Sequence, residues 1–216
     1  MKTTVNTNNK LKKCNVNGQK CTKIVVNNVQ VWSGLEYLYN AGDQATDFTG
    51  GWVKHTTLMP NSSNLTNWPY GPKGSVTVNS SNIVVSFGGE YGGVMVTTST
   101  PIDFKNEGIT SITFEGSTTI GGWGYDDYKY DNALTYATWV FALVPSLSNG
   151  QGYTKSYIHD YGRGYIRGNS SSTKTESFTK TLTGLDQLNG SYYVVLGLYR
   201  SVSGKFDITL KSITCE

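Results

Sequence analysis

The 216-residue chain carries 18 Lys and Arg residues against 15 Asp and Glu residues, a formal net charge of +3. This charge is too small and too uneven to indicate a nucleic-acid-binding surface, and the chain has no run of about 18 apolar residues that would span a membrane. The 25 glycines, the 15 tyrosines and the abundant Ser, Thr, Asn and Val residues favour strands and turns. We therefore predict an all-β protein that binds neither nucleic acid nor membrane.

The distribution of charge divides the chain near residue 35. The first 34 residues contain no acidic residue and six lysines, which are Lys2, Lys10, Lys12, Lys13, Lys20 and Lys23. The remaining residues include 12 basic and 15 acidic ones. A strand is expected at residues 35–39, where the composition changes. We predict a small N-terminal β-hairpin or meander at residues 1–34 and a jelly-roll β-sandwich at residues 35–216.

The N-terminal part contains a strong hairpin signal. Asn17-Gly18 is the preferred two-residue hairpin turn, so residues 11–16 are expected to pair with residues 19–26. Asn27-Asn28 would turn the chain again into a third strand at residues 29–32. Because a meander of this size cannot bury a core alone, we expect it to attach to another protein.

The same register places Cys14 opposite Cys21, with Asn15 opposite Lys20 and Val16 opposite Gln19. Opposed cysteines lie within reach of a disulfide. However, the position is expected to be a hydrogen-bonded pair, where opposing Cα atoms are farther apart and a cross-strand disulfide is strained. The sequence is therefore compatible with a disulfide between Cys14 and Cys21 and with two free thiols. The two histidines stand in no zinc-ligand spacing with these thiols, so no zinc site and no cofactor are predicted.

Residues 139–144 are apolar without interruption, which predicts a central strand buried on both faces. Near the C-terminus, residues 192–200 and 205–213 are expected to form a hairpin around residues 201–204. In its second strand, Phe206, Ile208 and Leu210 alternate with polar residues, so one face should contact water. Further strands are predicted at 75–78, 83–87, 93–98, 109–116, 156–166 and 177–182. The expected eight to ten strands fit a jelly roll.

Two groups of residues resemble a known family. The segment 13–32, with Asn17-Gly18, Lys23-Ile24-Val25-Val26-Asn27 and Val31-Trp32, resembles short hairpins in virion proteins of tailed bacteriophages and prophages. Residues 38–43, 49–52, 101–104 and 206–213 look like the galactose-binding-type jelly roll of phage tail, baseplate or head-fibre proteins and of bacterial carbohydrate-binding modules. The resemblance implies a virion structural or adhesion role. Where such modules bind calcium on an edge loop, this chain offers only Asp43 and Asp47, and no metal site is predicted.

The loop at residues 121–131 carries the most unusual chemistry. Flexible glycines there flank six candidate glycan-binding residues, which are Trp123, Tyr125, Asp126, Asp127, Tyr128 and Tyr130. Sugars stack their apolar faces on such rings, while carboxylates accept hydrogen bonds from the sugar hydroxyls. Alternatively, the rings cover a sheet edge or pack on a neighbouring subunit. Calcium bound by Asp126, Asp127 and Asp131 is a further alternative, although their spacing is not that of an EF-hand.

A second loop, at residues 159–168, combines two arginines with two tyrosines. Arg163 and Arg167 are candidate donors to an anionic glycan. The alternative is an ordinary solvated strand face. His159 and Asp160 are not a catalytic pair, because neighbours on a strand point to opposite faces.

No nucleophile elbow, metalloprotease motif or phosphate-binding loop is present. A glycosidase needs only two carboxylates, for which Glu90, Glu115, Asp126 and Asp127 are available. We nevertheless predict a protein that is not an enzyme.

The prediction for function is a phage virion structural protein of the tail, the baseplate or the head decoration. Residues 11–34 would bind other virion proteins, and the jelly roll would project outward and bind host-surface glycans. Assembly in the bacterial cytoplasm and a homo-oligomer set by the symmetry of the particle are expected. The alternatives are a free carbohydrate-binding module and a glycan-cleaving enzyme.

Overall fold

The computed structural model describes residues 15–16, 19–20, 23–26, 29–33, 37–40, 51–67, 74–79, 82–88, 92–121, 137–160, 173–200 and 205–216. These residues are mostly strands, with one short α-helix and one short 3-10 helix. The all-β prediction is confirmed. Within the described residues, no helix has the length and hydropathy of a membrane-spanning segment.

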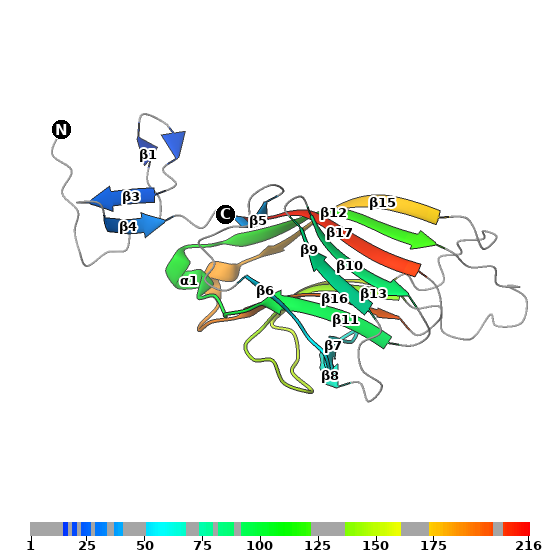
Figure 1. The fold of residues 1–216 in the computed structure, drawn as a ribbon. Helices are drawn as coiled ribbons and strands as arrows, with labels where there is room; N and C mark the ends of the chain where they lie inside the picture. Colours follow the sequence, from blue (N-terminus) through cyan, green and yellow to red (C-terminus); the bar gives the residue numbers. More distant parts are fainter. Residues whose placement is uncertain are drawn as a thin grey trace, which may run out of the picture.

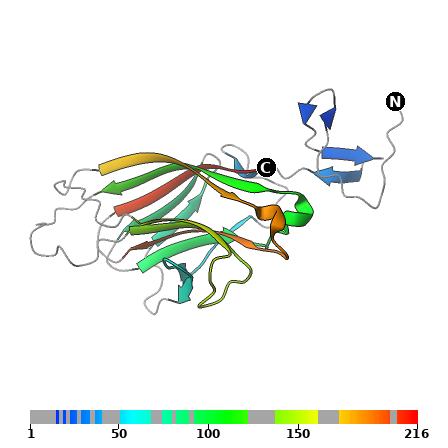
Figure 2. The same cartoon turned by 180° about the vertical axis from the view of Figure 1, so that it is seen from behind.

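Two antiparallel sheets lie face to face (Figures 1 and 2). The six-stranded sheet consists, in order, of β15 (Thr173–Thr183), β12 (Ser111–Gly121), β17 (Lys205–Cys215), β10 (Ile83–Gly88) and β9 (Gly74–Val78), with β5 (Tyr37–Asn40) paired to β17. The five-stranded sheet consists, in order, of β14 (Lys155–Asp160), β13 (Ala137–Val144), β16 (Tyr193–Arg200), β11 (Gly92–Thr98) and β6 (Trp52–Lys54). The predicted β-sandwich is therefore present, with eleven strands in its two sheets rather than the expected eight to ten.

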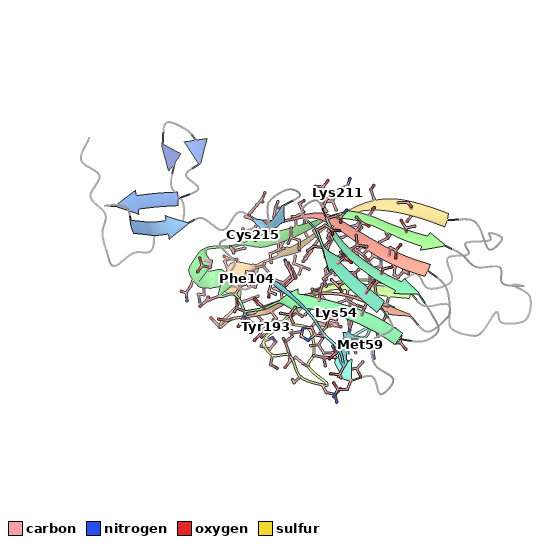
Figure 3. The ribbon with its side chains drawn as sticks, viewed as in Figure 1. Lys54, Met59, Phe104, Tyr193, Lys211 and Cys215 are labelled. Atoms are coloured by element: carbon pink, nitrogen blue, oxygen red, sulfur yellow. The ribbon has the colours of Figure 1, made fainter. Side chains whose placement is uncertain are left out.

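Alternating apolar residues of both sheets form the main core between the sheets. Its centre is aromatic. The Phe114 and Phe141 rings stack with centroids 4.6 Å apart, and Trp139 meets the Phe141 ring edge-on at 4.7 Å. Phe178 lies 4.9 Å from the Trp139 ring and joins β15 to this cluster. Side chains fill the space between the sheets in Figure 3.

The prediction that residues 139–144 are buried on both faces is confirmed. Trp139, Phe141 and Leu143 belong to the main core. Val140, Ala142 and Val144 belong to a second apolar cluster, which lies outside the five-stranded sheet. A small hairpin of β7 (Leu58–Pro60) and β8 (Leu65–Asn67) contributes Leu58 and Leu65 to that second cluster. The strands β6, β7 and β8 were not predicted from the sequence.

Two short helices lie at one end of the sandwich. The α-helix α1 (Phe104–Glu107) connects β11 to β12, and the 3-10 helix η1 (Leu185–Gln187) connects β15 to β16. Phe104 and Leu185 are fully buried there. The Asp103 carboxylate caps α1 by accepting a hydrogen bond from the Asn106 backbone N–H at 2.9 Å. Gly108 ends the helix in the left-handed conformation, at φ 71°.

The predicted pairing of residues 192–200 with residues 205–213 is wrong. β16 pairs with β11 and β13 in one sheet, whereas β17 pairs with β10, β12 and β5 in the other. Both segments are strands, and β17 alternates as expected, with Phe206, Ile208 and Leu210 fully buried. The strands separate because Leu196 and Leu198 of β16 belong to the same core as these residues. Leu196 and Leu198 face that core from the five-stranded sheet, and the β17 residues face it from the six-stranded sheet.

The N-terminal residues form two hairpins, in place of the predicted three-stranded meander. β1 (Asn15–Val16) pairs with β2 (Gln19–Lys20), and β3 (Lys23–Val26) pairs with β4 (Val29–Ser33) as a separate two-stranded sheet. The predicted register of Asn15 with Lys20 and Val16 with Gln19 is confirmed. Figure 1 shows both hairpins apart from the sandwich. Cys14 and Cys21 lie outside the described residues.

Candidate functional site

Four of the chain connections between the two sheets share one end of the sandwich. They join β10 to β11, β12 to β13, β14 to β15 and β16 to β17. In each case consecutive strands lie in opposite sheets, as in a jelly roll. The connecting segments 89–91, 122–136, 161–172 and 201–204 lie outside the described residues, but the strands that enter and leave them are described.

The register places all these strand ends at one end of the sandwich. In the six-stranded sheet, Gly121 pairs with Thr173 and Lys205, and Lys205 also pairs with Gly88. In the five-stranded sheet, Arg200 pairs with Ala137 and Gly92, and Asp160 pairs with Thr138. We call this the crossover end, and it lies at the right of Figure 1. It is defined by Gly88, Gly92, Gly121, Ala137, Asp160, Thr173, Arg200 and Lys205.

The predicted glycan-binding residues fall in two of the connecting segments. Trp123, Tyr125, Asp126, Asp127, Tyr128 and Tyr130 follow Gly121, and Arg163 and Arg167 follow Asp160. All eight lie outside the described residues. Because Gly121 and Thr173 are direct partners, the first segment starts next to the point where the second one ends. The two segments, whose nearest residues are 25 positions apart in the sequence (136 and 161), therefore start and end on paired strands.

Packed aromatic side chains lie just inside the crossover end. Trp139 is the third residue of β13 and Phe206 the second residue of β17, and both are buried. Leu198, the register partner of Trp139, is also buried. Since these strands are fixed by the core, the connecting segments start and end on a rigid scaffold. Such an arrangement is typical of binding sites built from loops.

The outer face of the five-stranded sheet is covered by the chain itself. β7 and β8 lie over Met95, Val140 and Val195 in the second apolar cluster. Met59 of β7 is fully buried and is labelled in Figure 3. A Cβ atom at Gly197 would lie 2.5 Å from Cγ of Pro60, so the hairpin approaches the β16 backbone closely. This face is therefore closed to a ligand over these strands.

Residues 147–153 hold the β7–β8 hairpin in place. The backbone N–H of Leu65 donates to the Gln151 carbonyl at 2.8 Å, and the Gly150 N–H donates to the Leu65 carbonyl at 2.8 Å. The Tyr153 hydroxyl lies 2.8 Å from the carbonyl oxygen of Asn61 and 2.9 Å from that of Asn64. Burial raises the pKa of Tyr153, so its hydroxyl stays protonated and donates.

The outer face of the six-stranded sheet is rich in hydroxyl groups. Its outward Ser and Thr residues are Ser75, Thr77, Ser86, Thr113, Ser117, Thr119, Thr175, Ser177, Thr179, Thr181, Thr183, Thr209, Ser212 and Thr214. Across β12 and β15, the Thr113 and Thr181 hydroxyl oxygens lie 2.9 Å apart. Among the outward side chains that the structure describes on these strands, none is aromatic. This part of the face offers no ring on which a sugar could stack.

Of the four carboxylates considered for glycosidase chemistry, only Glu115 lies within the described residues. Glu115 is exposed on the outer face of β12, opposite Thr179, six residues or about 20 Å from the crossover end. Glu90, Asp126 and Asp127 fall in connecting segments outside the described residues. Among described residues, no group of three or more His, Cys, Asp and Glu residues is placed to hold a metal ion.

His55 directly follows β6, the edge strand of the five-stranded sheet, and its side chain is partly buried. Its Nε2 lies 2.9 Å from Thr97 Oγ1. The Thr97 hydroxyl donates to the Thr98 carbonyl at 3.0 Å, so it accepts a hydrogen bond from the imidazole N–H. Partial burial lowers the pKa of His55.

Sequence reasoning missed two parts of this arrangement. It read residues 201–204 as a hairpin turn, although they connect two strands at the crossover end. It also missed the β7–β8 cover, whose strands are only three residues long. No local pattern marks either feature, because both depend on which sheet each strand joins.

No protein-family model matches the chain, and no curated protein sequence matches it. Among solved structures, a chain from carbohydrate-binding modules of the β-sandwich superfamily is similar at 13% identity and a TM-score of 0.42, with 87% of this chain and 65% of that chain covered. A legume lectin-like domain from Entamoeba histolytica has a TM-score of 0.45 at 6% identity, with 86% and 98% covered. The tailspike protein 4 enzymatically active domain of bacteriophage CBA120 has a TM-score of 0.37 at 9% identity, with 83% and 21% covered. Because these TM-scores lie below 0.5, we infer function from this chain's own residues.

Proposed function

We propose that this chain is a non-enzymatic glycan-binding β-sandwich with its sugar site at the crossover end. The observation that carries the proposal is the register, in which Gly121 pairs with Thr173 and Asp160 pairs with Thr138. Because of this register, the aromatic and acidic segment 122–136 and the arginine-containing segment 161–172 start and end on neighbouring strands. The outer faces of the two sheets also favour a site at the crossover end. The outer face of the five-stranded sheet is covered by β7 and β8, and among the described side chains on the outer face of the six-stranded sheet none is aromatic.

Binding at this end would need no covalent chemistry. The Trp123 indole and the tyrosine rings supply flat apolar surfaces for the C–H faces of a sugar. Asp126 and Asp127 accept hydrogen bonds from sugar hydroxyls. Arg163 and Arg167 donate to carboxylate or phosphate groups, which favours an anionic glycan.

A glycan array followed by calorimetry tests the proposal. Trp123→Ala and Tyr125→Ala should each weaken binding by about tenfold or more, because each removes a stacking ring. Asp126→Asn and Arg163→Gln should weaken binding in the same way. Two matched controls change exposed charges elsewhere: Asp186→Asn in η1, at the opposite end, and Lys211→Gln on the outer face of β17. The controls should bind like the wild type.

Full retention of binding in both aromatic variants would contradict the proposed site. Equal losses in the variants and in their controls would point to a surface other than the crossover end. The absence of binding across neutral and anionic glycans would contradict the glycan-binding function itself.

We further propose that the chain is displayed on a tailed-phage virion, assembled in the bacterial cytoplasm, with the N-terminal hairpins as its anchor. Each hairpin is a separate two-stranded sheet, and such a sheet is marginally stable alone. Pairing with strands of another virion protein would stabilise both hairpins. The resemblance of residues 13–32 to phage hairpins supports this role.

Immunogold labelling of particles from an induced lysate tests the virion role. An antibody against residues 35–216 should label tails, baseplates or heads, and unlabelled particles would contradict the role. A free carbohydrate-binding module would bind glycan without associating with particles. An enzyme would release reducing ends from host wall material, and Glu90→Gln or Asp126→Asn would abolish the release. We expect no such release from the wild-type protein.

A further inference from the structure

The long strand β15 lies at the edge of the six-stranded sheet. It pairs with β12 over its full length, from Thr173 to Thr183, and no other described strand pairs with it. Both ribbon views show β15 at the outer margin of the sheet (Figures 1 and 2). An edge strand of 11 residues presents about 36 Å of backbone for pairing with another strand.

The Ser and Thr residues of β15 are placed symmetrically about its middle residue, Phe178, and the other symmetric positions hold Glu176 with Lys180 and Lys174 with Leu182. When two copies pair antiparallel around a two-fold axis at Phe178, the whole strand overlaps, because Thr173 lies opposite Thr183 of the second copy. Glu176 then lies opposite Lys180 of the second copy, and Lys180 opposite its Glu176. Opposite charges in directly opposed positions stabilise an antiparallel pair.

Shifted registers lose this complementarity. A shift of two residues in one direction places Lys174 opposite Lys180, which is repulsive, and Glu176 opposite Phe178. A shift in the other direction places Lys180 opposite Phe178. The register with the greatest overlap is therefore also the one that pairs the charges.

We propose that β15 is a homodimer interface, through which two copies form one continuous twelve-stranded sheet. The partner strand at this edge is thus β15 of a second copy of this chain. A two-fold axis relates the two copies, so each contact occurs twice. On the outer face, Ser177 would oppose Thr179 of the second copy. Hydroxyl pairs of this type already connect β15 to β12, at Thr119 and Thr175, whose hydroxyl oxygens lie 2.9 Å apart.

The charged residues are well placed for this role. Glu176 is exposed, and Lys180 is partly buried with its Nζ 4.5 Å from the centre of the Tyr157 ring. This contact between β15 and β14 holds the Lys180 side chain on the inner side of the edge. The opposite reading is that a lysine on an edge strand prevents pairing between molecules. In the proposed register Lys180 lies opposite Glu176, which removes this obstacle at the centre of the strand, whereas Lys174 lies opposite Leu182 near its end.

Sedimentation of the full-length protein with charge-swapped variants distinguishes the two readings. The wild type should dimerise, and Glu176→Lys or Lys180→Glu alone should raise the dimer dissociation constant roughly 30-fold, because each replaces two attractive pairs by two repulsive ones. The double variant Glu176→Lys with Lys180→Glu should restore the dimer. Lys211→Glu, at an exposed side chain that projects away from the same sheet (Figure 3), is the matched control and should dimerise normally.

A monomeric wild type would overturn the proposal, as would a dimer that neither single substitution weakens. A double variant that stays monomeric would overturn the register. Hydrogen exchange adds a readout that needs no variant: amide protection along β15 should increase with protein concentration.

Discussion

Replacing Gly197 by alanine tests whether the β7–β8 hairpin lies on the five-stranded sheet as described. Gly197 is in the middle of β16, beneath Pro60. A Cβ atom at this position would lie 2.5 Å from Cγ of Pro60, 2.9 Å from its Cδ and 3.0 Å from the Val94 carbonyl oxygen. Since the proline ring is rigid and the carbonyl belongs to a paired strand, the added methyl group must displace the hairpin.

The expected change in the free energy of unfolding of Gly197→Ala is the difference between two contributions. Inserting a methyl group into a packed site costs about 1–3 kcal/mol. Removing a glycine from a strand interior returns about 0.5–1 kcal/mol. The free energy of unfolding should therefore fall by about 1–2 kcal/mol, which lowers Tm by roughly 3–6 °C in a domain of this size.

Thermal and urea unfolding of Gly197→Ala, Gly152→Ala and Pro60→Ala provide the assay. Gly152 is the matched control, because a Cβ atom there has no neighbour within 4 Å, and its substitution should leave stability unchanged or slightly raised. In the Pro60→Ala background, Gly197→Ala should cost about 1 kcal/mol less, since most of the clash is gone. Wild-type stability of Gly197→Ala, or an equal cost in both backgrounds, would refute the close approach of Pro60 to β16.

Two further predictions concern the same side of the sandwich. Tyr153→Phe removes the hydroxyl that lies against the Asn61 and Asn64 carbonyls, so the free energy of unfolding measured in urea should fall by about 1–2 kcal/mol; an unchanged value would mean that water replaces the hydroxyl at no cost. Burial lowers the pKa of His55 below 6.5, so the unfolded chain binds this proton more readily than the folded chain. The contribution of neutral His55 to stability is complete above about pH 6.5 and declines as the pH falls toward the folded-state pKa, so His55→Gln should reduce the loss of Tm between about pH 7 and about pH 5. An identical pH profile for the variant would show that other groups cause the loss.

Local patterns predicted strands well wherever burial alternates or is continuous. The apolar run at residues 139–144 correctly indicated a strand buried on both faces, because a strand between two apolar layers buries successive side chains in both of them. Asn17-Gly18 correctly fixed the pairs Asn15 with Lys20 and Val16 with Gln19, since a two-residue turn determines the register. Both features depend on residues close together in the sequence.

Short elements without periodicity were missed. β7 and β8 are too short to show alternation, and Pro60 within β7 argues against a strand in sequence-based reasoning. These strands form because they bury Met59 fully and contribute Leu58 and Leu65 to the second apolar cluster. Such stabilisation comes from residues far away in the chain.

The sequence by itself determined that this protein is all-β, where most of its long strands lie, and which loops carry rings and charges. Only the tertiary structure decided which strands pair. The segments 192–200 and 205–213 read as a hairpin, yet β16 and β17 belong to different sheets, because Leu198 and Phe206 face the same core from opposite sides. Four such connections have their flanking strand ends at the crossover end, including the ends at Gly121 and Asp160. Strand pairing depends on burying all apolar faces in one shared core, and that requirement acts between residues too distant in sequence for any local pattern to encode.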